Sequence, residues 1–312
     1  MITIVANGGL GNRMRAINSA VCLAGRTGHQ LRIVWEKVEG VDDVAASGSI
    51  AEGKLHPWHQ PDKFQADLAS EFGDLFVVPS EVEVIETIPY RCNLKCFWRL
   101  DLLRFHPREY CRKVFRTVVG LFQDQQFDLV LGNDEIEEIL KTGWDFETVS
   151  NSKRVLLFSG SQFLGGPFHG ELFVPVDHLQ ERIRAVTSDF GSSTVGVHIR
   201  RQDNTWAIEN SPERLFVREM NRLVVDNADT VFFLATDCGE TEQRMRERFP
   251  GQILSSNPER VRSTRAGIQD AVVDMYCLAR TQHILGSHWS SFGRMAGALG
   301  GVKMSIMKED GN

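Results

Sequence analysis

The second half of the chain alternates apolar runs with amphipathic stretches, and this alternation constrains the fold more than any other feature. The apolar runs at 194–200, 230–236, 253–254, 283–287 and 302–306 are typical of buried strands. The segments between them, at 212–227, 240–249, 266–281 and 292–299, carry apolar residues at helical spacing. Such an alternation forms a parallel sheet with helices on both faces, so we expect a doubly wound α/β domain.

The N-terminal half repeats this order more faintly. Residues 2–6 and 31–35 predict strands on either side of a helix that ends at Gly28, residues 155–159 predict a further strand, and residues 107–122 and 133–142 predict helices. A chain of 312 residues is long for one core and comfortable for two. We therefore predict two facing α/β, Rossmann-like domains, over residues 1–165 and 166–312, divided at the Ser/Gly-rich stretch 159–167.

Composition excludes several classes of protein. The net charge is -6, so there is no general basic field to hold nucleic acid, and an anionic ligand needs a local basic site. The first residues lack the basic flank and the long apolar core of a signal peptide, and no apolar run approaches the ~18 residues that span a bilayer. We expect a cytoplasmic protein without a transmembrane segment. Peripheral membrane association and the oligomeric state stay open.

The first motif follows the strand at 194–200, which ends in Arg200, Arg201, Gln202 and Asp203. Open α/β sheets bind ligands just beyond the carboxyl ends of their strands. Side chains two apart on a strand share a face, so we expect His198 and Arg200 to point the same way. An arginine fork there suits a phosphate, while a surface ion pair with Asp203 is the alternative.

The second motif is the turn from the strand at 283–287 into the helix at 292–299. Ser290, Ser291 and Phe292 stand where that helix begins, and Arg294 follows within its first turn. The positive end of a helix attracts anions, and serine hydroxyls donate to a phosphate or cap the helix.

The third motif is Thr236-Asp237, at the end of the strand at 230–236. A carboxylate at this edge accepts the N1 and N2 hydrogens of guanine or caps the next helix.

The fourth motif is the loop that contains Gly9, Gly11, Asn12 and Arg13. It is not a P-loop, because no Gly-Lys-Ser/Thr follows, and Met14 stands in place of the third glycine of the dinucleotide fingerprint. Such a loop lets the backbone approach a ligand closely, or serves a tight turn alone.

Together these motifs resemble those of the α1,2-, α1,6- and protein O-fucosyltransferase superfamily. The segment 198–203 looks like its His-x-Arg-Arg-x-Asp motif, and residues 8–14 are similar to the Gly-x-x-Gly-Asn-Gln-Met loop of its bacterial α1,2 members. Residues 235–237 and the block 274–294 look like its second and third motifs, in the same order. Arg13 replaces a glutamine of the α1,2 enzymes and Asn204 replaces a lysine of the α1,6 enzymes, so the linkage stays open.

The resemblance implies a GT-B arrangement, with the donor site in the C-terminal domain and the acceptor on the N-terminal side. It implies GDP-fucose as donor, a glycan acceptor, inversion at the anomeric carbon, no metal and no other cofactor. It further implies that His198 and Asp237 contact guanine and that Arg200 and Arg201 contact the diphosphate. Ser290, Ser291 and Phe292 would hold the β-phosphate, with the first loop closing over the donor.

Metal independence also has a physical argument, because arginines and a helix N-terminus stabilise a departing diphosphate. Glu209 is our candidate for the base that deprotonates the acceptor, and a solvated surface glutamate is the alternative. Other functions that stay open are the same fold with another GDP-sugar, a non-catalytic nucleotide-binding protein, and a dinucleotide-dependent oxidoreductase.

Overall fold

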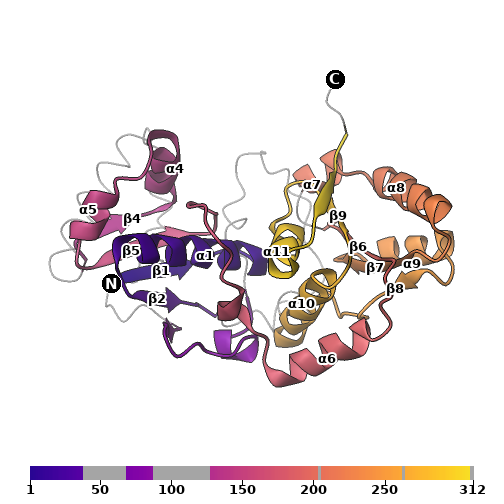
Figure 1. The fold of residues 1–312 in the computed structure, drawn as a ribbon, viewed down its shortest axis with the longest axis horizontal. Coiled ribbons are helices and arrows are strands. Elements are labelled where there is room, and N and C mark those ends of the chain that lie inside the picture. Colours follow the sequence, from indigo (N-terminus) through magenta and orange to yellow (C-terminus); the bar gives the residue numbers. More distant parts are fainter. Residues whose placement is uncertain (38–67, 87–126, 203–204, 262–263, 310–312) are drawn as a thin grey trace, which may run out of the picture.

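A computed structural model of the chain describes residues 1–37, 68–86, 127–202, 205–261 and 264–309. The predicted helix at 107–122 lies outside the described residues, as do Asp203 and Asn204. The described part contains two five-stranded parallel sheets, one in each half of an elongated molecule (Figure 1).

The first sheet has the strand order β3-β2-β1-β5-β4. Its strands are β1 (Ile2–Ala6), β2 (Leu31–Val34), β3 (Glu83–Ile85), β4 (Leu129–Leu131) and β5 (Val155–Ser159). Every residue of β1 is buried, which explains its unbroken apolar sequence, because a central parallel strand is covered on both faces. The other elements of this half are α1 (Leu10–Thr27), η2 (Phe72–Asp74), α4 (Asn133–Thr142), α5 (Phe146–Asn151) and η4 (Gly170–Phe173).

The second sheet has the order β10-β9-β6-β7-β8. Its strands are β6 (Thr194–Ile199), β7 (Val231–Thr236), β8 (Ile253–Leu254), β9 (Ile284–Ser287) and β10 (Met304–Met307). The helices of this half are α6 (Asp177–Thr187), α7 (Thr205–Asn210), α8 (Glu213–Asp226), α9 (Gly239–Arg248), α10 (Arg265–Leu278) and α11 (Ser291–Gly300). The predicted alternation is confirmed in every one of its elements, to within a few residues at their ends.

The positions of two helix boundaries have local causes. Helix α1 ends where Gly28 adopts a left-handed backbone (φ 69°), as the sequence predicts, because glycine alone adopts that conformation without strain. Helix α6 begins at Asp177 rather than at the predicted Pro175, because Pro175 forms an antiparallel bridge with Phe76 of the first half.

The two halves share one continuous hydrophobic core. That core joins β1, β2 and α1 to α10 and α11, and helix α1 packs directly on α11 where the halves meet (Figure 1). Phe76 packs edge-on against Phe173, with ring centroids 5.6 Å apart, so the segments that connect the halves are also buried. The domain boundary at 165/166 stays a prediction.

Candidate active site

Three strands of the second sheet end side by side. Ile199 pairs with Thr236, and His198 pairs with Gly286, so the residues that follow β6, β7 and β9 meet at one carboxyl edge. Strand β6 ends at Ile199, one residue earlier than predicted, and Arg200 therefore begins the loop.

Asp237 holds that loop in place. Its carboxylate accepts hydrogen bonds from the Arg201 backbone N–H (2.7 Å) and the Gln202 backbone N–H (3.4 Å). It also forms an ion pair with the Arg200 Nε (3.2 Å), and both side chains are mostly buried. Asp237 stands one residue before Cys238, the N-cap of α9. The guanine contact and helix capping, the two roles left open by the sequence, both stay predictions.

The two arginines have different surroundings. The Arg200 backbone N–H donates to Ser287 Oγ (3.0 Å), which ties the loop to β9. The Arg201 guanidinium donates to the carbonyls of Arg200 (2.9 Å) and Ser211 (2.8 Å), and burial lowers its pKa from the usual value. Arg201 thus braces the loop against the start of α8. This geometry favours Arg200 as the arginine that meets a ligand.

His198 lies beneath α11. Its side chain is only 5% exposed and stacks on the ring of Phe292, with centroids 4.9 Å apart and planes 21° apart. Its Nδ1 is buried and has no hydrogen-bond partner among the described residues. Burial, together with the positive charge of Arg200, lowers the pKa of His198 to about 3, so the ring is neutral.

The N-termini of α1 and α11 converge at this edge. A Cβ added to Gly11 would lie 3.0 Å from the C, O and Oγ atoms of Ser291, so the two helices touch there through backbone. Their N-caps, Gly9 and Ser290, make no side-chain capping bond, and neither helix has an acidic residue in its first turn. Serine capping alone is therefore wrong for Ser290. The positive ends of the two helices therefore meet, and neither first turn contains a carboxylate that would neutralise them.

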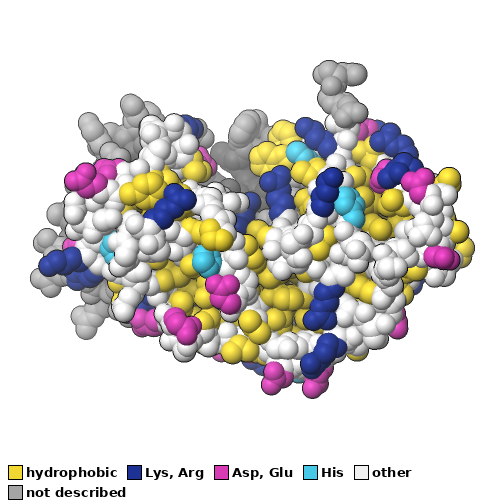
Figure 2. All heavy atoms as spheres, in the orientation of Figure 1, with side chains coloured by type: hydrophobic (Ala, Val, Ile, Leu, Met, Phe, Trp, Pro, Cys, Tyr) yellow, Lys and Arg dark blue, Asp and Glu magenta, His cyan; other side chains and the backbone are white. Residues whose placement is uncertain are grey.

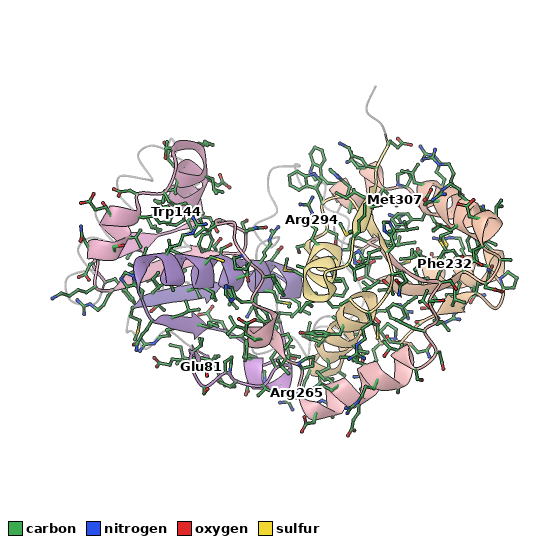
Figure 3. The ribbon with its side chains drawn as sticks, in the orientation of Figure 1. Glu81, Trp144, Phe232, Arg265, Arg294 and Met307 are labelled. Atoms are coloured by element: carbon green, nitrogen blue, oxygen red, sulfur yellow. The ribbon has the colours of Figure 1, made fainter. Side chains whose placement is uncertain are left out.

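Two further arginines, one from each half, are close enough for their charges to interact. Arg294 of α11 is exposed at the notch between them (Figure 3). Arg15 of α1 donates from Nε (3.2 Å) and Nη2 (3.0 Å) to the Gly160 carbonyl. Burial lowers the Arg15 pKa, and the nearby charge of Arg294 lowers it further. Lys and Arg side chains gather around this notch on the visible surface (Figure 2). A bound anion would relieve this repulsion.

The remaining predicted residues have supporting positions. Arg13 is 3% exposed, and its guanidinium lies 4.9 Å over the Trp35 ring. It donates to the carbonyls of Gly8 (3.0 Å) and Glu36 (2.8 Å), so it supports the first loop from the buried side. Asn12 packs against Gly8, whose backbone is left-handed (φ 82°).

Two further positions complete the predicted set. Thr236 accepts the Cys238 backbone N–H through Oγ1 (3.3 Å). Glu209 is exposed on α7, a short helix that the sequence did not predict.

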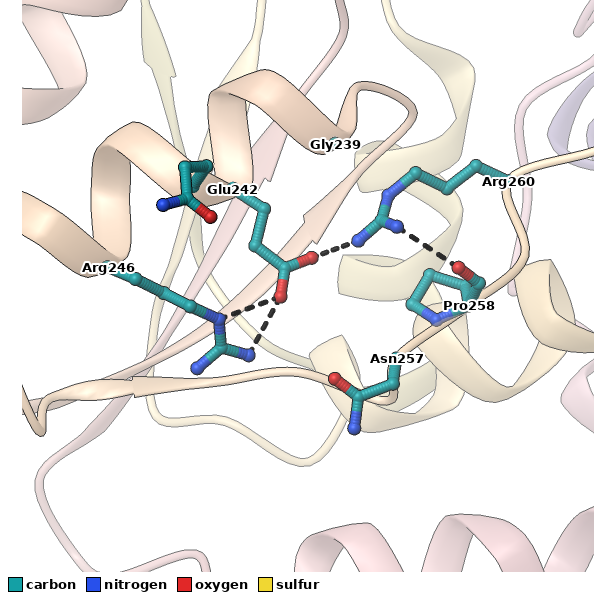
Figure 4. Close-up of a pocket in the computed structure, with 7 residues that line it drawn as sticks. Gly239, Glu242, Arg246, Asn257, Pro258 and Arg260 are labelled. Carbon is teal, nitrogen blue, oxygen red and sulfur yellow. Dashed lines mark hydrogen bonds and ion pairs between the residues drawn. The ribbon is translucent and has the colours of Figure 1, made fainter.

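A polar pocket of about 190 Å³ lies between α9 and the segment that follows β8. Gly239 and Asn257 line it from opposite sides (Figure 4). Glu242 pairs there with Arg246 (2.7 Å) and Arg260 (Figure 4). Its volume is below the ~300–1,000 Å³ of whole-ligand pockets, so it has room for part of a ligand.

The structure brings most of the predicted residues to one edge. His198, Arg200, Asp237, Ser290, Ser291 and Phe292 gather there, with Gly11 against them from the first half. Arg15 was missed, although its position four residues after Gly11 places both on one face of α1. Within the described ranges no cluster of His, Cys, Asp and Glu is arranged to hold a metal ion, and no helix there is long and apolar enough to cross a membrane.

The two sheets define a fold class. Two facing Rossmann-like domains with parallel sheets form the GT-B arrangement of glycosyltransferases, and the predicted fold class is confirmed. No protein-family model matches the chain, and no curated protein matches it by sequence.

Solved structures of fucosyltransferases share this fold over nearly the whole chain. NodZ α1,6-fucosyltransferase from Bradyrhizobium, soaked with GDP-fucose, has a TM-score of 0.54 at 17% identity and covers 96% of this chain and 92% of its own. An arginine-to-lysine variant of Arabidopsis thaliana FUT1 with GDP has a TM-score of 0.56 at 12% identity, over 100% of this chain and 70% of that one. Apo POFUT1 has a TM-score of 0.50 at 12% identity, over 98% and 97%. The resemblance indicated by the four motifs is therefore matched by a shared fold.

Proposed function

We propose that the protein is an inverting, metal-independent glycosyltransferase that moves fucose from GDP-fucose to a hydroxyl of a glycan. One observation carries this proposal, which is the concentration of positive charge at the carboxyl edge of the second sheet. The N-termini of α1 and α11 meet there, and Arg200, Arg15 and Arg294 lie around them. The shared fold with GDP-fucose-using enzymes supports the choice of donor.

The chemistry that this site favours is departure of a nucleoside diphosphate. As the bond between the anomeric carbon and the β-phosphate oxygen breaks, negative charge grows on that oxygen. Arg200 is held by Asp237 and Ser287, so its charge is already oriented before the reaction. Preorganised donors of this kind typically contribute ~10²–10³-fold each to turnover. In this proposal the guanine lies next to Asp237, on the side of the polar pocket that α9 lines.

The acceptor supplies the second half of the reaction. Its hydroxyl oxygen attacks the anomeric carbon from the face opposite GDP, which inverts the configuration in a single displacement. Glu209 takes the hydroxyl proton in this proposal, since it is exposed on α7 just beyond the arginine loop.

A panel of sugar nucleotides tests the proposed function. Release of GDP or UDP is measured from GDP-fucose, GDP-mannose and UDP-glucose, with EDTA present and a mixture of oligosaccharides as acceptor. We expect turnover of GDP-fucose above all others and no effect of EDTA. Preferred use of GDP-mannose would keep the enzyme class and change the sugar. No turnover of any donor would remove the enzymatic proposal.

A further inference from the structure

Two exposed tryptophans lie together beside the candidate site. Trp206 is 64% exposed and Trp289 is 67% exposed, and they are the aromatic members of the exposed large hydrophobic side chains in the described part of the chain. Their ring centroids are 6.3 Å apart and their planes 29° apart, so they stack on each other. They come from different segments, α7 and the turn between β9 and α11. An exposed aromatic pair of this kind marks a binding surface.

The backbone holds Trp289 outward. Its φ is 55°, in the left-handed region that bulky residues rarely adopt, so the surrounding structure must enforce this conformation. The ring of the preceding His288 lies edge-on to Trp289, with centroids 6.0 Å apart. The His288 backbone N–H donates to the Oγ of buried Ser211 (2.7 Å), whose carbonyl accepts from Arg201. Ser211 therefore holds both the turn that carries Trp289 and the loop that carries Arg201.

The position of the pair relates it to the reacting centre. Trp289 immediately precedes Ser290 and Ser291 at the positive end of α11. Trp206 stands three residues before Glu209 on α7, and residues at this spacing are neighbours on a helix surface. The pair thus continues the candidate site on the side of the proposed base. It adjoins β9, whereas the polar pocket follows β8 on the other side of the sheet.

We propose that Trp206 and Trp289 form an acceptor subsite and bind one pyranose ring of the acceptor glycan by stacking. Both residues belong to the second half, so this subsite differs from the acceptor on the N-terminal side that the motif resemblance implies. This inference rests on the proposed function for its choice of occupant. A pyranose presents an apolar face of C–H groups, which matches the flat apolar face of an indole ring. A ring held there places its neighbouring hydroxyl beside Glu209.

Kinetics of four variants test the subsite. Trp206→Ala and Trp289→Ala should each raise the KM for the acceptor at least ~10-fold, while the Kd for GDP changes less than ~2-fold. Trp206→Phe and Trp289→Phe keep a flat ring and should recover most of the acceptor affinity. Val225→Ala, at an 85% exposed position on α8, is the control for loss of a surface hydrophobic side chain and should leave both constants unchanged.

A binding measurement separates this proposal from the proposed function. Intrinsic tryptophan fluorescence is titrated with maltotriose, cellotriose and the trimer of N-acetylglucosamine, with no donor present. We expect at least one of them to change the fluorescence of the wild type and to lose that effect in Trp206→Ala. This result stands even if no GDP-sugar is turned over. An unchanged acceptor KM in both alanine variants would overturn the subsite, and so would a rise in the Kd for GDP equal to the rise in acceptor KM, which would assign the pair to the donor.

Discussion

The contact between Gly11 and Ser291 gives the sharpest structural prediction, because it joins the two halves at the candidate site. A Cβ at Gly11 would lie 3.0 Å from backbone and side-chain atoms of Ser291, whereas carbon atoms in ordinary contact are ~3.5–4.0 Å apart. Gly11→Ala must therefore move the ends of α1 and α11 apart by a few tenths of an ångström. A displacement of 1 Å costs ~10²-fold in a preorganised site, so we expect this smaller shift to lower turnover of GDP-fucose by about 3- to 10-fold.

Gly25→Ala is the matched control on the same helix. Gly25 is exposed near the end of α1, and an added Cβ there would meet nothing within 4 Å. Alanine is better than glycine inside a helix by about 1 kcal/mol, so this variant should be as stable as the wild type or more so, with full activity. Thermal melting and donor turnover are measured for both variants. Wild-type turnover and GDP affinity in Gly11→Ala would refute a role of the α1–α11 contact in the site.

Three further predictions follow from individual residues. Arg200→Lys keeps the charge and loses the planar fork, so kcat should fall at least ~10²-fold. Arg201→Lys should mainly lower the melting temperature. A larger loss of kcat in Arg201→Lys would make Arg201, and not Arg200, the arginine that meets the ligand. Glu209→Gln should lower the rate of transfer by ~10²–10⁴-fold with nearly unchanged GDP affinity. Wild-type turnover in this variant would mean that Glu209 is a solvated surface residue and not the base. Burial lowers the pKa of His198 to about 3 and raises that of Asp274 to about 7. Between pH 6.5 and 4, falling pH therefore destabilises the fold through His198, which is protonated first in the unfolded chain, and stabilises it through Asp274, which is protonated first in the folded chain. Asp274→Asn removes the second effect, so its free energy of unfolding should drop more than that of the wild type from pH 6.5 to pH 4, and parallel curves would contradict this.

The fold was largely predictable because its signals are local. The strands of the second sheet are continuous apolar runs, and the helices between them have one apolar face, so periodicity alone located them. Strands β3 and β4 were not predicted, since each has three residues and only partial burial. Helix α7 was missed for a similar reason, because six residues carry too little periodicity to distinguish a helix from a loop.

The site was predictable only in part, because its geometry depends on contacts distant in sequence. The motifs located His198, Arg200 and Asp237, since each stands at the end of a predicted strand. The convergence of Gly11 on Ser291 joins residues 280 positions apart in the chain, and no local pattern encodes it. The repulsion between the positive charges of Arg15 and Arg294 is likewise a long-range contact that no local pattern encodes. For Arg13 the sequence predicts a donor contact, whereas the structure buries this side chain against Trp35.

Nucleotide binding by isothermal calorimetry tests the central claim most directly, because it needs neither the acceptor nor a known linkage. GDP, UDP and ADP are titrated into the full chain in the presence of EDTA and again with magnesium. We predict that GDP binds at least ~10-fold more tightly than UDP and ADP, with the same Kd in both buffers. Equal affinity for all three nucleotides, or GDP binding only with magnesium, would contradict a metal-independent GDP-sugar site.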